Sequence, residues 1–172
     1  MLTIVLAALG VYFSVLNGRG LLRYAEFRRV QSTALLTWPV GHPRYFQMQL
    51  VLGVLSGAVA VLNASMHRPV HHVFSQAVMA LYFIVIVPLS ARIHLGLYRD
   101  GVWGDAGFLP YAQIGRMAFR ETPDIVLYLL PRGRSRPLRL PVPAAEYGAV
   151  RKVLEEKKRE GLVSTQERIL GL

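Results

Sequence analysis

The sequence predicts a membrane part of three transmembrane helices, followed by a small α+β domain with an antiparallel sheet of five or six strands and a C-terminal helix. Three long apolar runs contain no Asp, Glu, Lys or Arg: residues 2–18, 45–66 and 73–91. About 20 apolar residues of helix cross the hydrocarbon of a bilayer. After Arg92 the chain changes to short alternating segments broken by turn residues, which is typical of half-buried strands.

Composition supports this division. Of the 172 residues, 53% are hydrophobic, which exceeds the usual share in a soluble domain. Cysteine is absent, which excludes disulfides, thiolate metal sites and cysteine nucleophiles. The net charge of +10 comes from 17 Arg and three Lys against ten acidic residues. The positive-inside rule accounts for this excess, so nucleic acid is not an expected partner.

The first apolar run is predicted to be an uncleaved anchor. A secretory signal begins with basic residues, whereas here the chain begins Met-Leu-Thr-Ile and the positive charges follow the run. The run is short, so it either extends past Gly18 into Leu21 and Leu22 or lies on the membrane as a peripheral helix.

The distribution of charge predicts the topology. Residues 19–44 hold five Arg and one Glu, residues 67–72 hold one Arg, and the chain from Arg92 onward holds fourteen basic and nine acidic residues. Basic loops stay in the cytoplasm. With three spans, both basic segments lie on that side, so we expect an inner-membrane protein with its N-terminus outside and its C-terminal domain inside.

The segment 19–44 is predicted to be an amphipathic cytoplasmic loop, with a helix lying in the inner interface and Trp38, Tyr45 and Phe46 as interfacial aromatics. A simple anchor is favoured over a regulatory lipid sensor. In the second run, Gly53 and Gly57 have the small-xxx-small spacing of helix packing, either within the chain or against a partner helix. Pro88 is expected to kink the third span.

Residues 93–160 are predicted to form the cytoplasmic domain, and residues 161–172 a C-terminal tail. The candidate strands are Ile93–Leu97, Val102–Trp103, Phe108–Tyr111, Ile114–Phe119, Ile125–Leu130 and Leu138–Val142. Asp100-Gly101 is a hairpin signal between the first two. A final helix fits residues 144–160, with Pro143 at its first turn and an inward stripe of Tyr147, Val150 and Leu154.

Two sequence motifs in this domain are similar to motifs of a known family. The segments Gly101-Val102-Trp103 and Tyr111-Ala112-Gln113-Ile114 resemble those of bacterial membrane proteins with a pleckstrin-homology-like (PH-like) tail, especially the uncharacterised DUF5673 family. The resemblance covers roughly residues 92–158. It implies a curved antiparallel sheet closed by the C-terminal helix, with seven strands when complete. An abbreviated sheet would leave an open edge. The resemblance implies no catalytic residues.

Candidate chemical sites are few. His67, His71 and His72 cluster, but Pro69 interrupts the helix that would align them and no Asp or Glu lies in that loop, so no metal and no cofactor are expected. No nucleophile elbow, P-loop, paired carboxylates or HExxH pattern is present, so the chain is not expected to be an enzyme. A hydrolase would depend on His94 or Asp105.

Four basic residues in one hairpin are the best candidate for a surface that binds lipid headgroups or an acidic partner: Arg132, Arg134, Arg136 and Arg139. The expected function is non-enzymatic docking to a membrane protein complex, to a second copy or to anionic lipid headgroups. The alternative is an oligomeric transport or channel assembly whose pathway is lined by the polar residues of the spans: Gln47, Gln49, Asn63 and Gln76.

Overall fold

The computed structural model describes residues 2–39, 41, 45–133 and 136–162. It divides into two compact units, and each unit contains two separate stretches of the chain. The helical unit comprises Met1–Glu26 and Val40–Ile93, and the sheet unit comprises Phe27–Pro39 and His94–Leu172. The predicted domain boundary near residue 92 is therefore incomplete, because residues 27–39 belong with the tail.

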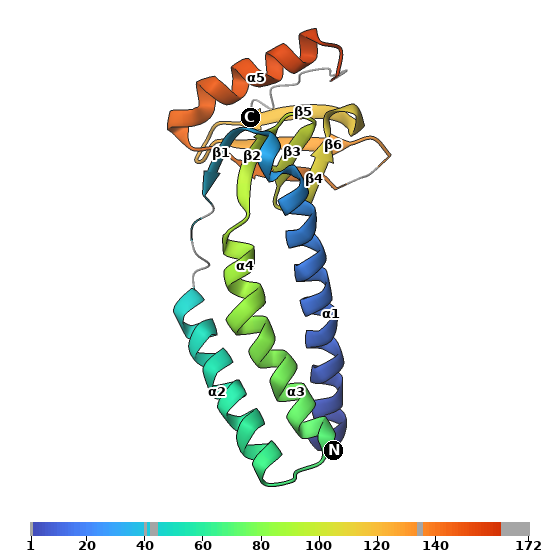
Figure 1. The fold of residues 1–172 in the computed structure, drawn as a ribbon. Helices are drawn as coiled ribbons and strands as arrows, with labels where there is room; N and C mark the ends of the chain where they lie inside the picture. The colour runs from blue at the N-terminus through green and yellow to red at the C-terminus, as the bar shows by residue number, and fades with distance from the viewer. Residues whose placement is uncertain (1, 40, 42–44, 134–135, 163–172) are drawn as a thin grey trace. The chain divides into compact units, whose positions relative to one another are not determined.

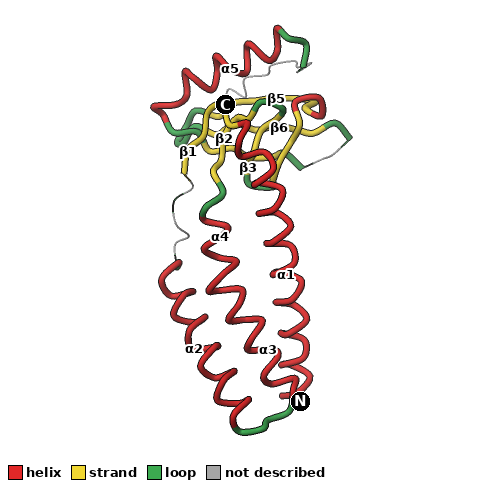
Figure 2. Tube along the Cα trace, viewed as in Figure 1, coloured by secondary structure: helices red, strands yellow, loops and turns green. Residues whose placement is uncertain are grey.

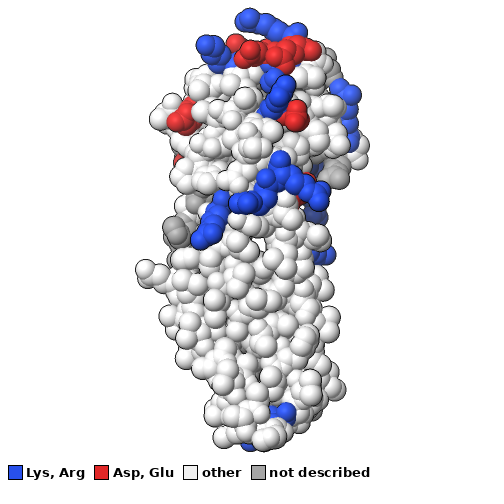
Figure 3. All heavy atoms as spheres, viewed as in Figure 1, with Lys and Arg blue, Asp and Glu red and all other residues white. Residues whose placement is uncertain are grey.

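The helical unit contains the three expected apolar segments (Figure 1). These are α1 (Leu2–Val30), α2 (Phe46–Ser65) and a third segment made of α3 (Val70–Leu81), a π-helical turn (Tyr82–Ile86) and α4 (Val87–Ala91). Each is long and apolar enough to cross a membrane. On the side drawn in Figure 3, uncharged atoms cover this unit between its ends.

The helix α1 continues well beyond the first apolar run. It has 29 residues, so it is about 43 Å long, whereas the hydrocarbon core is about 30 Å thick. The predicted separate interfacial helix in residues 19–44 is therefore wrong: residues 19–30 are the second half of α1. Gly18 and Gly20 do not end the helix, because strong helix formers such as Leu21, Leu22 and Arg23 follow them.

The π-helical turn precedes Pro88, the residue expected to kink the third segment. Proline has no amide hydrogen, and its ring clashes with the carbonyl four residues earlier in a regular helix. A wider turn over Tyr82–Ile86, closed by a bond from the Val87 amide to the Tyr82 carbonyl, lies just before the proline, where a regular helix is disfavoured.

Small and polar residues of α1 meet α3 and the π-helical turn at close range. A Cβ at Gly10 would lie 3.2 Å from Phe74 and from the Ser75 hydroxyl oxygen, and one at Gly20 would overlap Ile86. Between them the buried Asn17 donates from Nδ2 to the Val78 carbonyl at 2.9 Å. The sequence predicted such close packing only in the second apolar run, around Gly53 and Gly57.

The two glycines of α2 lie against the third segment. A Cβ at Gly53 would lie 2.8 Å from Ile84 and 2.9 Å from Phe83, and one at Gly57 would lie 3.7 Å from Ala80. The spacing of these two residues is therefore used for packing within the chain, where small residues allow helices to approach closely.

The difference between Gly18 and Gly20 gives a matched test of the α1 packing. We expect Gly20→Val to destabilise the helical unit by about 1–3 kcal/mol, because the new side chain overlaps Ile86. Gly18→Val carries the same intrinsic helix cost but meets nothing within 4 Å. Helicity followed during a graded SDS titration should show a lower midpoint for Gly20→Val alone, and equal midpoints would contradict this packing.

The sheet unit has seven antiparallel strands within its described residues, in sheets of four and three strands (Figure 2). The first sheet has the order β1 (Ala34–Pro39), β2 (His94–Tyr98), β3 (Gly101–Gly104) and β4 (Gly107–Pro110). The second contains β5 (Ile114–Arg120), β6 (Val126–Pro131) and β7 (Leu138–Pro141). The helix α5 (Tyr147–Arg159) follows. The predicted tail strands and final helix are confirmed to within a few residues.

The seventh strand comes from the segment that precedes α2. β1 pairs antiparallel with β2, from Ala34 opposite Tyr98 to Pro39 opposite His94. Its Trp38 is buried and donates from Nε1 to the Pro141 carbonyl at 2.9 Å, so the prediction that Trp38 is an interfacial aromatic is wrong. The expectation of five or six strands is too low, because it did not include β1. Residues 40–93 are an insertion between β1 and β2.

The core of the sheet unit combines both stretches of chain. Phe27, at the end of α1, is 1% exposed, and its ring meets Trp103 edge to face with centroids 5.5 Å apart. Leu97, Val102, Leu127, Leu129 and Leu140 are also fully buried. From the opposite side, α5 contributes Val150 and Leu154, two residues of the predicted inward stripe.

Two buried tyrosines make this core sensitive to high pH. The Tyr98 hydroxyl donates to the His94 carbonyl at 3.0 Å, and the Tyr111 hydroxyl donates to the Tyr98 carbonyl at 3.0 Å. Burial raises the pKa of Tyr98 to about 12, and burial with the nearby charges of Asp100 and Glu160 raises the pKa of Tyr111 still further.

In the unfolded chain both hydroxyls ionise near pH 10, so the folded state holds its protons longer. The stability they contribute is complete below pH 10 and is lost as the pH rises through 12. We expect the near-ultraviolet circular dichroism of the sheet unit to collapse in that window. The loss should be shallower in Tyr111→Phe, and an unchanged slope in that variant would contradict the assignment.

Candidate interaction surface

The predicted basic hairpin lies between β6 and β7. Arg132 is in the turn that follows β6, Arg136 precedes β7 and Arg139 lies within β7. All three are exposed, and the Arg132 backbone amide donates to the Gln113 carbonyl at 2.7 Å. Arg134 lies outside the described residues.

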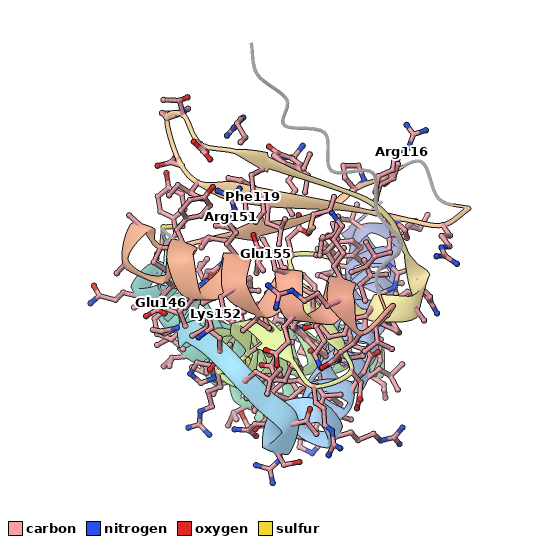
Figure 4. The ribbon with its side chains drawn as sticks, turned by 90° about the horizontal axis from the view of Figure 1, so that it is seen from above. Arg116, Phe119, Glu146, Arg151, Lys152 and Glu155 are labelled. Atoms are coloured by element: carbon pink, nitrogen blue, oxygen red, sulfur yellow. The ribbon has the colours of Figure 1, made fainter. Side chains whose placement is uncertain are left out.

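The second sheet extends this basic surface onto two further strands. Along β5 the exposed or half-buried side chains of Arg116, Ala118 and Arg120 alternate with the buried Met117 and Phe119. Figure 4 shows Phe119 toward α5 and Arg116 away from it. Because side chains alternate between the faces of a strand, Arg116 and Arg120 share the outer face of the sheet.

The register places the partner residues on the same face. Arg116 lies opposite Leu130, Ala118 opposite Tyr128, and Tyr128 opposite Arg139. Directly opposed residues in an antiparallel pair project to the same side. We define the arginine face by these six residues: Arg116, Ala118, Arg120, Tyr128, Leu130 and Arg139.

Tyr128 is the centre of the arginine face. The guanidinium carbon of Arg120 lies 5.9 Å from the centroid of its ring, and that of Arg139 lies 5.8 Å from it. Each contact has the geometry of a cation–π interaction. One cation comes from β5 and the other from β7, so the two contacts join the outer strands across the central one.

Hydrogen bonds to the backbone hold β7 in place. The Arg139 amide donates to Asp105 Oδ1 at 2.9 Å, and the Asp105 amide donates to the Arg139 carbonyl at 3.0 Å. A Cβ at Gly104 would meet Leu138 and lie 2.8 Å from the Arg139 carbonyl oxygen. The turn after β3 therefore fixes the strand that carries Arg139.

Charges on the exposed surface of α5 are of both signs, unlike those of the arginine face. Arg151 and Glu155 approach to 3.8 Å, and the Lys157 amine contacts Glu160 at 2.8 Å, so basic and acidic groups alternate there (Figure 4). The Tyr147 hydroxyl donates to Glu121 at 2.6 Å, and this hydrogen bond raises the pKa of Tyr147. This surface is mixed in charge, in contrast to the arginine face.

The histidine cluster lies at the connection between α2 and α3. His67 has a positive φ of 51°, and Pro69 precedes the first residue of α3. The His71 and His72 rings are 4.5 Å apart. Within the described residues, no group of three or more His, Cys, Asp or Glu side chains is placed to hold a metal ion.

The two residues considered for a hydrolase have structural contacts. The His94 ring lies 6.3 Å from that of Phe27, and Asp105 accepts the hydrogen bond from the Arg139 amide. Burial leaves Trp103 Nε1 without a hydrogen-bond partner within the described part of the chain, although its ring is packed between Phe27 and Phe108.

The polar residues considered for a transport pathway are distributed over separate environments. Asn63 Nδ2 donates to Gln76 Oε1 at 3.3 Å, which joins α2 to α3 within one chain. Gln47 is exposed near the start of α2, whereas the Oε1 atom of Gln49 is buried. Sequence inspection missed Asn17, which is buried more deeply than any of these four.

Comparisons with known proteins add no relative: no family model, no curated protein and no solved structure matches this chain.

Proposed function

We propose that the chain is a non-enzymatic integral protein of the inner (plasma) membrane that presents a cytoplasmic PH-like module for docking to a membrane protein complex. Three features support this proposal. Three helices are able to span a bilayer, the strand β1 of the sheet unit lies in the chain between two of these helices, and the sheet unit has an exposed basic face.

The pairing of β1 with β2 supports the proposed topology. Two strands of one sheet must lie on the same side of a membrane. The segment between Pro39 and His94 holds α2 and the α3–α4 segment, so two crossings by these helices are consistent with the pairing of β1 and β2. Both flanking segments are basic, which favours a cytoplasmic location for them by the positive-inside rule. If α1 also spans, the N-terminus lies outside.

The strand count supports the PH-like identity. The resemblance implied seven strands closed by a C-terminal helix, and the described residues contain seven antiparallel strands followed by α5. Its two motifs also lie at matching places: Gly101-Val102-Trp103 lies in β3, and Tyr111-Ala112-Gln113 forms the turn before Ile114 begins β5. Membership of the DUF5673 family stays a prediction.

The arginine face is the observation that carries the docking function. It places two arginines, Arg120 and Arg139, against the half-buried Tyr128 and a third, Arg116, on the same face of the sheet. Tyr and Arg are enriched at the energetic centres of protein interfaces. Arginine side chains stay protonated and only donate hydrogen bonds, so such a surface is suited to binding anionic groups.

Photo-crosslinking in native membranes tests the docking function. A photoreactive amino acid is placed at Ala118 on the arginine face, at Asp124 in the turn after β5 and at Gly148 on α5, with Val61 on the exposed side of α2 as a control. We expect a discrete product of higher mass from at least one position on the sheet unit. Free monomer at all three positions would overturn the proposal.

A further inference from the structure

The arginine face has unmatched positive charge. Among its six residues three are arginines and none is acidic. Within the described residues, no salt bridge joins a carboxylate to Arg116, Arg120 or Arg139. Glu121 is next to Arg120 in the chain, but it already accepts the Tyr147 hydroxyl. The charges of this face are therefore available to an anionic partner.

Tyr128 organises two of these charges. With both guanidinium groups within 6 Å of its ring, Arg120 and Arg139 lie along the sheet instead of extending freely into solvent. A guanidinium that contacts a ring still has five N–H donors in its plane for carboxylate oxygens. Less side-chain entropy is lost on binding when the donors are already held in place.

The spacing of the charges indicates an extended partner. Arg116 and Arg120 are four residues apart on β5, which corresponds to about 13 Å along a strand. Arg139 lies two strands away from β5, which corresponds to about 10 Å across the sheet. A single carboxylate cannot contact all three, whereas several carboxylates along one segment can.

The absence of exposed apolar residues favours a protein segment over a lipid surface. In the described residues of the sheet unit, the exposed large hydrophobic side chains are Leu35 and Leu162, and neither belongs to the arginine face. Surfaces that enter a membrane interface place apolar side chains among the acyl chains. Besides its three cations and Tyr128, the arginine face holds only the half-buried Ala118 and Leu130.

We propose that the arginine face binds an acidic segment of a partner protein, with Arg120 and Arg139 donating to its carboxylates beside Tyr128 and Arg116 engaging a further carboxylate of the same segment. This inference rests on the proposed docking function and names the partner class that the face selects.

The test uses the full chain in a mild neutral detergent and a fluorescent ten-residue peptide with five glutamates. Binding is measured by anisotropy at 0.1 M salt. The variant Arg120→Gln/Arg139→Gln is compared with Lys152→Gln/Arg159→Gln, which removes the same charge from exposed positions of α5. We expect at least tenfold weaker binding in the first variant and less than a threefold change in the second. Equal weakening would overturn the proposal, because it would show a response to net charge alone.

Two further measurements distinguish the role of the tyrosine and the class of partner. Tyr128→Phe keeps the ring and should bind within twofold of the parent protein, whereas Tyr128→Ala should lose at least threefold. Glycerophosphoserine, a soluble lipid headgroup, and a ten-nucleotide single strand are the competitors. Displacement of the peptide by either at a lower concentration than unlabelled peptide would overturn the assignment to an acidic protein segment.

Photo-crosslinking separates this inference from the docking function. If crosslinks form at Asp124 or Gly148 and are unchanged by Arg120→Gln/Arg139→Gln, the docking function holds and the inference about the arginine face is wrong. If free monomer is recovered at every position on the sheet unit, the docking function itself is wrong. Crosslinks at Ala118 that disappear in the double variant support both.

Discussion

Residues 93–160 expressed alone are expected to be largely unfolded, although they contain every strand that alternation in the sequence predicts. The missing part is residues 27–39. Without them β2 loses its partner β1, Trp103 loses the ring of Phe27, and the buried Trp38 with its hydrogen bond to Pro141 is gone. Truncating a buried Phe or Trp costs about 3–5 kcal/mol each, against a total stability of about 5–15 kcal/mol for a small domain.

Joining the missing residues 27–39 directly to the tail should restore folding. Pro39 pairs with His94, so the ends of the insertion are adjacent in the sheet. A soluble chain that joins residues 27–39 to residues 94–160 through a short Gly-Asn-Gly linker should therefore fold, with a cooperative thermal transition by circular dichroism and dispersed amide resonances. A cooperative transition of residues 93–160 alone, within about 5 °C of the joined chain, would show that β1 is not part of the folding unit.

Gly96→Val is expected to break the pairing of β1 with β2 in the full chain. Gly96 has a φ of 150°, and a Cβ there would overlap the Leu36 carbonyl oxygen and lie 2.8 Å from the Thr37 Cα. Both obstacles are backbone atoms, so no side-chain rotation relieves them. We expect a loss of about 4 kcal/mol or more, the range typical of severe backbone clashes and of strain at positive φ.

A second glycine, Gly107, separates the cost of the backbone clash from the cost of strain at positive φ. Gly107 also has a positive φ, of 114°, but a Cβ there would meet nothing within 4 Å. Gly107→Val should therefore show only the cost of backbone strain, about 1–3 kcal/mol. The measurement is the denaturation midpoint of the joined soluble chain, read from tryptophan fluorescence. Equal losses at Gly96 and Gly107 would mean that the contact with β1 does not limit substitution.

Local pattern was enough to predict most of the sheet unit. In β5 and β7 the buried Met117, Phe119, Leu138 and Leu140 alternate with exposed residues, so the strands could be read directly from the sequence. The hairpin signal at Asp100-Gly101 predicted the first turn to within one residue, because the structure places the turn at Arg99-Asp100 and begins β3 at Gly101. Alternation of this kind is a property of neighbouring residues, and sequence reasoning detects it well.

The strand β1 could not be recognised in this way. Its sequence, Ala-Leu-Leu-Thr-Trp-Pro, has one buried residue, Trp38, and its leucines favour helix as much as strand. It is a strand because β2, far along the chain, supplies its hydrogen bonds. Pairing partners separated by two apolar helices leave no local signal.

Of the arginine face, the sequence predicted only Arg139, for the same reason. The predicted residues Arg132, Arg134, Arg136 and Arg139 are close in the sequence, whereas Arg116 and Arg120 belong to another strand. Their relation to Tyr128 depends on the register of β5, β6 and β7, which only the structure provides. A signal was present: Arg116 and Arg120 occupy outward positions of a strand whose Met117 and Phe119 face inward.

The insertion of α2 and the α3–α4 segment between β1 and β2 has a consequence for biosynthesis. The ribosome completes β1 before either inserted helix exists, and β2 emerges only after both. In the proposed topology, both inserted segments cross the bilayer before β2 reaches the side on which β1 lies. A chain in which only one of the two segments has crossed would hold β2 on the opposite side, so β1 would stay unpaired.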